Sequence, residues 1–347
     1  MTSIAILGGG SWGTALSIVL SRSHKSHDLS LWMRDPALAE VVSKSRVNEL
    51  YLPACPIPAA VAITSDLAHA LANANIVVGA MPSAYARAAY SRALPFIGKT
   101  VRVFVSATKG LEPATHMRIT EVLSQILADK FSTALGVAVL SGPSFALEAA
   151  RGDPTAVVVA SQSRQSPENA SGVERVEDYI QAEFAGPSFR LYTNDDVVGV
   201  ELAGAMKNVM AIAAGTCQGL GLGTNAIAAL ITRGLAEMAR LAMAVGARAE
   251  TLSGLAGLGD LVLTCTGSLS RNRQLGIELG KGRALPEIVA STRMVAEGVG
   301  TAGALLALAS EYHIELPITV QVNAILHHGK SPREAMEQIM GRPQKRE

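Results

Sequence analysis

Short runs of apolar, often β-branched residues recur along the first 194 residues, with helix-like stretches between most of them. Such runs predict buried strands. The predicted strands cover residues 4–8, 29–33, 61–64, 76–81, 101–107, 137–140, 156–160 and 189–192. Buried strands that alternate with helices indicate a doubly wound, mostly parallel sheet with ligands at the carboxyl ends of its strands. A polar segment, 161–172, is predicted to be a surface loop inside this domain.

The pattern changes after Asn194, where strand-like runs stop and Ala-, Gly- and Leu-rich helical sequence begins. We therefore predict a dinucleotide-binding, Rossmann-like domain over 1–194 and an all-helical substrate and catalytic domain over 195–347. In KSPREAMEQIM, Ser331 is expected to cap a helix that starts at Pro332, with Glu334 completing a capping box.

The first predicted strand runs into GGGSWG and then into a helix-like segment. Gly8, Gly10 and Gly13 fit the GxGxxG pattern, in which one glycine makes the turn, one lets the backbone approach a pyrophosphate and one lets helix and strand pack closely. The phosphates of a dinucleotide would lie at the helix N-terminus. A strand before the motif and a helix after it favour a cofactor site over a chance glycine turn.

The second predicted strand ends at Arg34 and Asp35. An arginine at this place suits the 2′-phosphate of NADP, whereas an acid suits the ribose hydroxyl of NAD. Arg34 favours NADP, and Asp35 leaves NAD open, because a shift of one residue would exchange their roles.

In GVELAGAMKNVM, residues 199–210, Lys207 has only apolar or small neighbours three and four positions away. Burying an ammonium group is costly unless it is paired or its pKa falls. Chemistry is one reason for such a lysine, and a side chain that reaches the surface from the edge of a core is the other.

Further polar residues follow predicted strands or glycine-rich segments. Lys109 and Ser144 come after strand ends, and each suits either a ligand contact or an ordinary loop. Asp260 suits either a catalytic site or a helix N-cap. The SRNR cluster, 270–273, offers the donors that a phosphate needs, or forms a solvated loop.

Composition narrows the classes of protein. With 347 residues, 49% hydrophobic content and a net charge of +1, the chain is globular and has no basic field for nucleic acid. Three scattered cysteines fit a reducing cytoplasm and no zinc site, and the N-terminus shows no signal peptide. The histidine pairs at 24/27 and 327/328 lack further ligands, so no metal is expected. The uncharged stretch 209–232 is interrupted by polar and glycine residues, so no membrane span is expected.

Taken together, the motifs resemble the bacterial type of NAD(P)-dependent glycerol-3-phosphate dehydrogenase along nearly the whole chain. They are GGGSWGTAL, LWMRDP, SATKGLE, LSGPSFA, GVELAGAMKNVMAIAAG, NAIAALITRGLAEM, LSGLAGLGDLVLTCT, SRNR and MVAEGV. The resemblance implies reversible reduction of dihydroxyacetone phosphate to sn-glycerol 3-phosphate for phospholipid synthesis, and a cytoplasmic homodimer.

The resemblance also implies roles for individual residues. The implied cofactor contacts are Ser11, Trp12, Arg34, Lys109, Ala146, Arg271, Val295 and Glu297. The implied substrate contacts are Lys109, Gly142, Ser144, Lys207, Asp260, Ser270, Arg271 and Asn272. Lys207 falls on the proton donor and acceptor of the family, with Asp260 expected to position it and Asn208 to assist. Bringing a lysine pKa from about 10.4 to about 7 or 8 needs on the order of 3 to 5 kcal/mol of desolvation or cationic neighbours.

Two rival functions remain at this point. A β-hydroxyacid dehydrogenase pairs a similar cofactor domain with a helix-borne lysine but acts on a carboxylate, and a redox sensor would bind cofactor without turnover. Ile227 stands where the family often has a basic residue, and MPSAYAR replaces a commoner VPS form. The MPSAYAR departure, like the unusual YLPACPIPAAVAIT segment before the third predicted strand, does not touch the residues expected to transfer the proton, whereas Ile227 removes one charge that the family often has near its site.

Overall fold

The structure is a computed structural model that describes residues 1–128, 130–131, 135–162, 164–165, 174–291 and 296–344. The chain divides into two compact units, Met1–Glu112 with Met117–Glu201 and Pro113–His116 with Leu202–Glu347. The change from strand-like to helical sequence predicts a domain boundary between 194 and 195. The two compact units divide seven residues later, between 201 and 202, which lie inside a helix. The different roles expected of the two domains stay a prediction.

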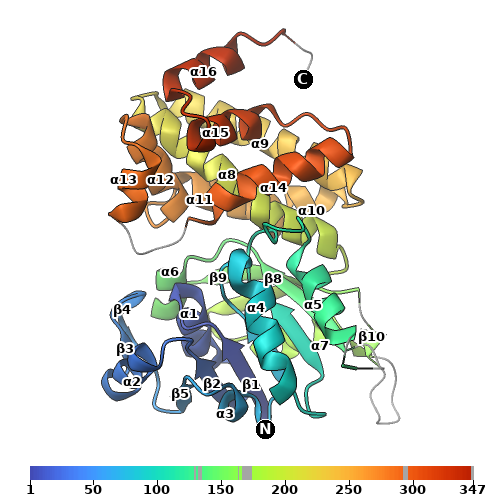
Figure 1. Ribbon diagram of the computed structural model, residues 1–347. Helices are drawn as coiled ribbons and strands as arrows, with labels where there is room; N and C mark the ends of the chain where they lie inside the picture. Colours follow the sequence, from blue (N-terminus) through green and yellow to red (C-terminus); the bar gives the residue numbers. More distant parts are fainter. Residues whose placement is uncertain (129, 132–134, 163, 166–173, 292–295, 345–347) are drawn as a thin grey trace. The chain divides into compact units, whose positions relative to one another are not determined.

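The first unit is built on one eight-stranded sheet, shown in Figure 1. Its strands are β1 (Thr2–Leu7), β2 (His27–Trp32), β5 (Val61–Thr64), β6 (Ile76–Gly79), β7 (Val103–Ser106), β8 (Gly136–Ser141), β9 (Thr155–Ala160) and β12 (Phe189–Asn194). They lie in the order β12-β9-β8-β7-β6-β1-β2-β5, and only the β8–β9 pair is antiparallel. All eight correspond to predicted strands, so the mostly parallel sheet is confirmed.

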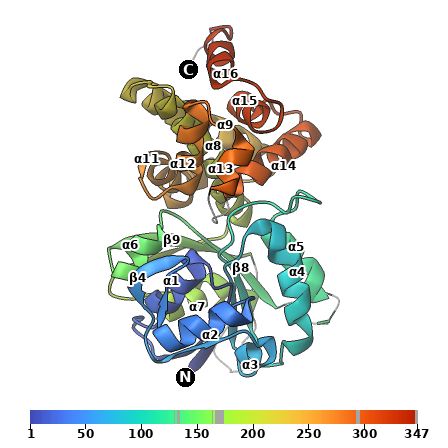
Figure 2. The same cartoon turned by 60° about the vertical axis from the view of Figure 1, so that its left-hand side comes forward.

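Helices cover both faces of this sheet (Figures 1 and 2). One face packs against α1 (Ser11–Leu20), α2 (Pro36–Ser45), α6 (Ala146–Arg151) and α7 (Val176–Phe184). The other packs against α3 (Leu67–Leu71), α4 (Ser83–Ala93), the 3₁₀ turn η1 (Leu94–Phe96) and α5 (Ile119–Ala128). Successive residues of β1 alternate between the two cores, Ile4 and Ile6 in the first and Ala5 and Leu7 in the second. This two-sided burial explains why the strands appear in the sequence as continuous apolar runs.

The strand order places β1 at the point where the chain changes direction. From β1 the chain adds β2 and β5 on one side, and it then crosses over to add β6 on the other side. Ligands of doubly wound sheets bind at the carboxyl ends of the strands at such a point. The glycine motif follows the carboxyl end of β1 and therefore lies there.

Two small antiparallel pairs were not predicted from the sequence: β3 (Val47–Asn48) with β4 (Leu52–Pro56), and β10 (Arg164–Gln165) with β11 (Glu174–Arg175). Strands of two paired residues carry too little periodicity to be recognised. β10 falls within the predicted surface loop 161–172, most of which lies outside the described residues.

In its described part, the regular elements of the second unit are all helices, and Pro113–His116 adds a turn. Its helices are α8 (Val197–Gly219, whose first residues lie in the first unit), α9 (Thr224–Ala244), α10 (Ala249–Ser253), α11 (Asp260–Thr266), α12 (Arg271–Gly280), α13 (Leu285–Ala290), α14 (Glu297–Glu311), α15 (Pro317–His327) and α16 (Pro332–Met340). A π-helical turn, η2 (Leu255–Gly259), joins α10 to α11. The capping box at the start of α16 is confirmed, since Ser331 Oγ accepts from Glu334 N at 3.2 Å and Glu334 Oε2 accepts from Ser331 N at 3.1 Å.

Helices α8 and α12 contact each other through glycines. A Cβ added to Gly215 or Gly219 of α8 would lie 2.0 or 2.2 Å from a backbone oxygen of α12. A Cβ added to Gly276 or Gly280 of α12 would lie 2.1 or 2.5 Å from a backbone oxygen of α8. The two backbones are therefore in direct contact, which small residues alone permit.

Helix α8 is also long and apolar enough to cross a membrane by length and composition. However, 94% of its most apolar window is buried inside the protein, as in the core helix of a folded domain.

Candidate active site

The glycine turn after β1 has the geometry that a dinucleotide requires. Gly8 adopts φ +124°, and a Cβ there would lie 2.5 Å from the oxygen of Ala80. A Cβ on Gly13 would lie 1.8 Å from the oxygen of Gly8, so α1 packs directly on the turn. A Cβ on Gly10, in contrast, would meet nothing within 4 Å. Gly8 and Gly13 thus permit close packing of the backbone, and Gly10 leaves open space in which a ligand can approach the turn.

This arrangement fits the pyrophosphate of NAD(P). Gly10 is the N-cap of α1, and no side chain caps the N–H groups of that helix. Uncapped N–H groups and the helix dipole attract a phosphate. The residues present therefore match the group that the sequence implied.

Asn48 supports the glycine turn and was missed by the sequence reasoning. It is fully buried, and its Nδ2 donates to the oxygen of Gly9 and to Thr14 Oγ1, both at 2.9 Å. Ser11 is held too, since its Oγ donates to the oxygen of Tyr51 at 2.7 Å. Trp12 packs on the core, and its buried Nε1 has no hydrogen-bond partner among the described residues.

The residues after β2 divide two tasks between them. Asp35 caps α2, its Oδ1 accepting from Ala37 N at 3.0 Å and Leu38 N at 3.3 Å. The guanidinium of Arg34 lies over the ring of Tyr85, 5.4 Å from its centroid. Since the cap engages the Asp35 carboxylate, Arg34 is the better candidate to meet the far end of a cofactor.

Three predicted residues of the first unit come together at the ends of β7 and β8. Lys109 Nζ and Ser144 Oγ both donate to the oxygen of Gly142, at 2.9 Å each. Gly142 adopts φ +128°, in which a side chain would be strained. Ala146 begins α6 two residues after Ser144.

An ion pair between α4 and Glu112, three residues after Lys109 in the chain, was not predicted. Arg87 of α4 donates to both oxygens of Glu112, from Nε at 2.7 Å and from Nη2 at 2.8 Å. The Glu112 side chain is 9% exposed and the Arg87 side chain 36%. The bond to Glu112 raises the pKa of Arg87 above its usual range, so the arginine remains charged.

In the second unit, Lys207 is buried and paired. Its residue is 6% exposed and that of Asp260 1%. Nζ donates to Asp260 Oδ1 and, at 3.0 Å, to Thr264 Oγ1. The expectation that Asp260 holds Lys207 agrees with this geometry. Asp260 is not an N-cap, because the cap of α11 is Gly259 and the carboxylate is turned toward the lysine.

Thr264 is the residue of this cluster that the sequence reasoning missed. Its Oγ1 donates to the backbone oxygen of Asp260 at 2.6 Å and accepts from Lys207. It lies four residues after Asp260 on the same helix face, which is the signal that could have found it. Next to it, burial raises the pKa of the Cys265 thiol to about 12, although the charges of Lys207 and Arg273 oppose that shift.

The SRNR segment is the start of a helix and not a solvated loop. Ser270 caps α12, its Oγ accepting from Arg273 N at 3.2 Å. Asn272 is buried, with Nδ2 donating to Asn208 Oδ1 and Oδ1 accepting from Gly298 N, both at 3.0 Å. Arg271 is the first residue of α12 and is exposed over part of its surface, although burial of its guanidinium lowers its pKa and the charge of Glu297 opposes that shift.

Of the two residues predicted from the MVAEGV motif, the structure describes one. Glu297 is its first residue, whereas Val295 lies outside the described residues.

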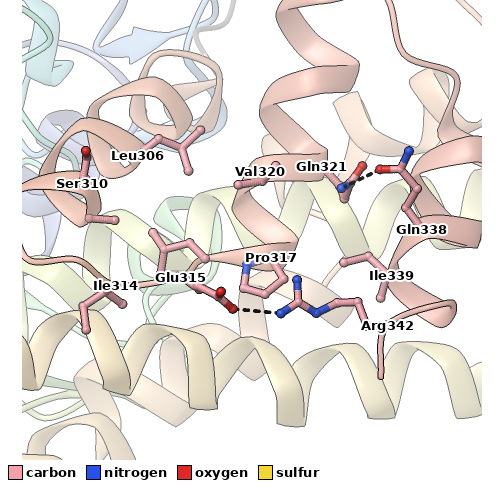
Figure 3. Close-up of a pocket in the computed structure, with 12 residues that line it drawn as sticks. Leu306, Ser310, Ile314, Glu315, Pro317, Val320, Gln321, Gln338, Ile339 and Arg342 are labelled. Atoms are coloured by element: carbon pink, nitrogen blue, oxygen red, sulfur yellow. Dashed lines mark hydrogen bonds and ion pairs between the residues drawn. The ribbon is translucent and has the colours of Figure 1, made fainter. Parts of the chain in front are cut away.

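The second unit also has a pocket of about 510 Å³ beside α14, α15 and α16, shown in Figure 3. Glu315 and Arg342 form an ion pair of 2.9 Å across it, and the amides of Gln321 and Gln338 meet at 3.2 Å. None of the predicted site residues lines this pocket. In the described part of the chain, no group of three or more His, Cys, Asp or Glu could hold a metal ion.

Comparison with known proteins gives one family for both halves of the chain. The model described as "NAD-dependent glycerol-3-phosphate dehydrogenase N-terminus" matches residues 3–166, and the corresponding C-terminus model matches residues 196–337. A glycerol-3-phosphate dehydrogenase (NAD(P)+) of Koribacter versatilis is 52% identical, with 99% of this chain and 98% of that protein covered. One of Acidobacterium capsulatum is 49% identical, with 99% of each covered.

A solved structure agrees with these relatives. The crystal structure of glycerol-3-phosphate dehydrogenase from Coxiella burnetii superposes with a TM-score of 0.89 at 40% identity, and 98% of this chain and 99% of that chain are covered. The glycine turn, the helical second unit and these matches along the full length lead to one conclusion. The chain belongs to the NAD-dependent glycerol-3-phosphate dehydrogenase family.

Proposed function

We propose that this chain catalyses the reversible NAD(P)H-dependent reduction of dihydroxyacetone phosphate to sn-glycerol 3-phosphate, with Lys207 as proton donor and acceptor. The reaction supplies glycerophospholipid synthesis. The buried cluster of Lys207, Asp260 and Thr264 carries the proposal for the lysine, since family membership alone does not assign a role to it.

Bound NAD(P)H supplies the hydride. The chain's own contribution is the proton and the charge that stabilises the alkoxide forming at the ketone oxygen. Lys207 Nζ provides both, and Asp260 and Thr264 hold that nitrogen in place. In the reverse direction the amine must be neutral to accept the alcohol proton. Because the Asp260 carboxylate favours the ammonium form, the pair has to loosen when substrate is bound.

For the substrate phosphate, the start of α12 is the proposed anchor in the second unit. Arg271 offers a guanidinium at the first position of α12. Asn272 Oδ1 accepts from Gly298 N, and one N–H of its Nδ2 donates to Asn208. The second N–H of Nδ2 is therefore the donor that we propose for the substrate phosphate. Lys109, Gly142 and Ser144 are proposed as the substrate contacts of the first unit.

For the cofactor, the proposed contacts are Gly8, Gly10, Ser11, Trp12, Gly13, Arg34, Lys109, Ala146, Arg271, Val295 and Glu297. The Asp35 carboxylate is engaged as the cap of α2, so Arg34 is the residue after β2 that we propose to contact the ribose end of the cofactor. An arginine at that place supports a preference for the 2′-phosphate of NADP. We retain the division into a cofactor domain over 1–194 and a catalytic domain over 195–347.

A β-hydroxyacid substrate is not favoured by the family match, and a redox sensor without turnover would have no use for Lys207. Absorbance at 340 nm with NADPH or NADH and dihydroxyacetone phosphate tests the proposed reaction. A 2-oxoacid and a 3-oxoacid are assayed beside it. Oxidation of the cofactor only with an oxoacid would overturn the proposed substrate.

Replacing Lys207 tests its role. We expect Lys207→Met to lower kcat by about 10²- to 10⁴-fold, the usual contribution of a positioned acid or base. Binding of NADPH, followed by fluorescence, should be retained. The control is Lys44→Met, since Lys44 is an exposed lysine of α2 that forms an ion pair with Glu40 at 2.6 Å on the surface of that helix. Parent-like turnover by Lys207→Met would refute the assignment.

We further propose that the protein is a cytoplasmic homodimer, by analogy with its family. Light scattering after size-exclusion chromatography gives the mass directly. A mass near 36 kDa, that of one chain, would refute the dimer.

A further inference from the structure

Lys109 lies on a loop that follows β7, and a loop lysine has many rotamers to lose before it can serve a site. Its side chain is held by the Gly142 oxygen, at 2.9 Å. The backbone of its loop needs separate support, because Gly110, the next residue, adopts φ +146° and gives the chain local freedom.

The loop is fastened before Lys109 by bonds to the last residue of β6 and to the segment after that strand. Ala107 N donates to the oxygen of Gly79 at 2.8 Å, and the buried Thr108 Oγ1 donates to the oxygen of Met81 at 2.8 Å. This side of the lysine is therefore tied to the sheet and to the segment that packs on the glycine turn.

After Lys109 the loop is fastened by the backbone bridge between Leu111 and Arg118 and by the side chain of Glu112. Both of its oxygens accept from one guanidinium, that of Arg87 on α4, and its N–H donates to the oxygen of Met117 at 2.9 Å. A two-bond pair fixes orientation as well as distance, which one lysine could not do. Arg87 is itself oriented by Gln125 Oε1, 3.1 Å from Nη2.

We propose that the Arg87–Glu112 ion pair positions Lys109 for the phosphate-bearing substrate. The inference rests on the proposed function, in which Lys109 contacts substrate, and it adds two positioning residues that do not touch the substrate themselves. The pair ties the loop to α4 on the far side of Lys109, and its loss leaves that side held by the backbone bonds of Leu111 and Glu112 to the segment 117–118. We therefore expect loss of the pair to weaken substrate binding and to leave the rate of the chemical step nearly unchanged.

The main experiment measures KM and kcat for dihydroxyacetone phosphate in Glu112→Gln and Arg87→Met. We expect KM to rise about tenfold, the equivalent of one lost charge-assisted contact, with kcat within about twofold of the parent. Arg87→Lys keeps the charge but not the two-bond geometry, and an intermediate KM is expected. An unchanged KM in both Glu112→Gln and Arg87→Met overturns the proposal.

A double-mutant cycle separates positioning from general destabilisation. In a Lys109→Met background, Glu112→Gln should leave KM unchanged, because the lysine that it positions is gone. If the KM changes of Lys109→Met and Glu112→Gln multiply in full in the double variant, the ion pair does not act through Lys109 and the proposal is wrong. Melting curves of each variant show whether it is folded. If Glu112→Gln does not fold, the same cycle is run with Arg87→Lys, and the same outcomes decide.

Glu177→Gln is the matched control. Glu177 is likewise a buried glutamate, 2% exposed, paired with a half-exposed arginine, Arg175, but at the start of α7. It should leave KM unchanged. Calorimetric titration with glycerol 3-phosphate gives a readout without turnover, and its Kd should rise about tenfold in Glu112→Gln and Arg87→Met but not in Glu177→Gln. If the parent protein binds glycerol 3-phosphate but shows no turnover, the proposed function fails, and this titration still decides the role of the pair.

Discussion

The two units use glycine for opposite purposes. In the turn after β1, Gly10 faces open space, whereas in the contact between α8 and α12 each of four glycines faces a backbone oxygen of the other helix. The first use leaves room for a ligand, and the second removes the room between two helices. A glycine in the sequence therefore says only that space or freedom is needed, and the surroundings decide what fills it.

The polar groups of the two regions differ in the same way. The helix N–H groups at Gly10 are not capped by any side chain. Around α8 and α12, Lys207 is paired with Asp260, and Asn208 is bonded to Asn272. The helix contact through glycines brings the start of α12 against α8, so that Asn272 reaches Asn208. The turn is open to a ligand from outside, and the helical cluster is largely satisfied by its own residues.

The largest expected effect comes from filling the closed contact. Gly276→Ala would place a Cβ 2.1 Å from the oxygen of Ile212, and neither backbone can move away without shifting a helix. We expect the free energy of unfolding to fall by about 3 kcal/mol or more. Urea denaturation measures this change. A loss below about 1 kcal/mol would show that α8 and α12 are not in direct contact.

Filling the open turn should affect binding and not stability. Gly10→Ala meets nothing within 4 Å and has φ −79°, so the free energy of unfolding should change by less than about 0.5 kcal/mol. We expect the Kd for NADPH to rise about tenfold or more, since the methyl group occupies the approach of the pyrophosphate.

Gly300→Ala is the control for this comparison, because a Cβ at Gly300 in α14 also meets nothing within 4 Å. It should leave NADPH binding unchanged and stabilise the helix by about 0.4–1 kcal/mol. Equal losses of NADPH binding in Gly10→Ala and Gly300→Ala would remove the distinction between the two regions.

The smallest expected effect concerns the exclusion of solvent from the Lys207 cluster. The reactivity of Cys265, next to Thr264, measures that exclusion. Its pKa of about 12 in the folded protein is above the usual value of 9.0, so folding disfavours its thiolate. The stability that this thiol contributes is complete below pH 9 and is lost as pH rises from 9 toward 12. At pH 8.5 iodoacetamide should modify Cys265 only after unfolding, as mass spectrometry of the peptides can show. Prompt modification of the folded protein would mean that the cluster is open to solvent.

The local pattern of the sequence was enough for much of this protein. It predicted all eight strands of the large sheet, the glycine turn, the capping box at Ser331 and the unusual lysine at 207. These features are readable because they depend on residues within about one turn or one strand of each other. The family resemblance rested on the same local motifs, and the comparisons confirmed it.

Only the tertiary structure decided which polar groups meet. Asp260 and Thr264 reach Lys207 across 53 and 57 residues of chain, and Asn48 reaches the glycine turn across 39. Asp35 proved to be a helix cap, Asp260 was not one, and Arg87 was found on Glu112. Periodicity states which face of an element is buried, but a polar side chain on that face is paired by whatever another element brings against it. That pairing exists only once the helices and strands have packed.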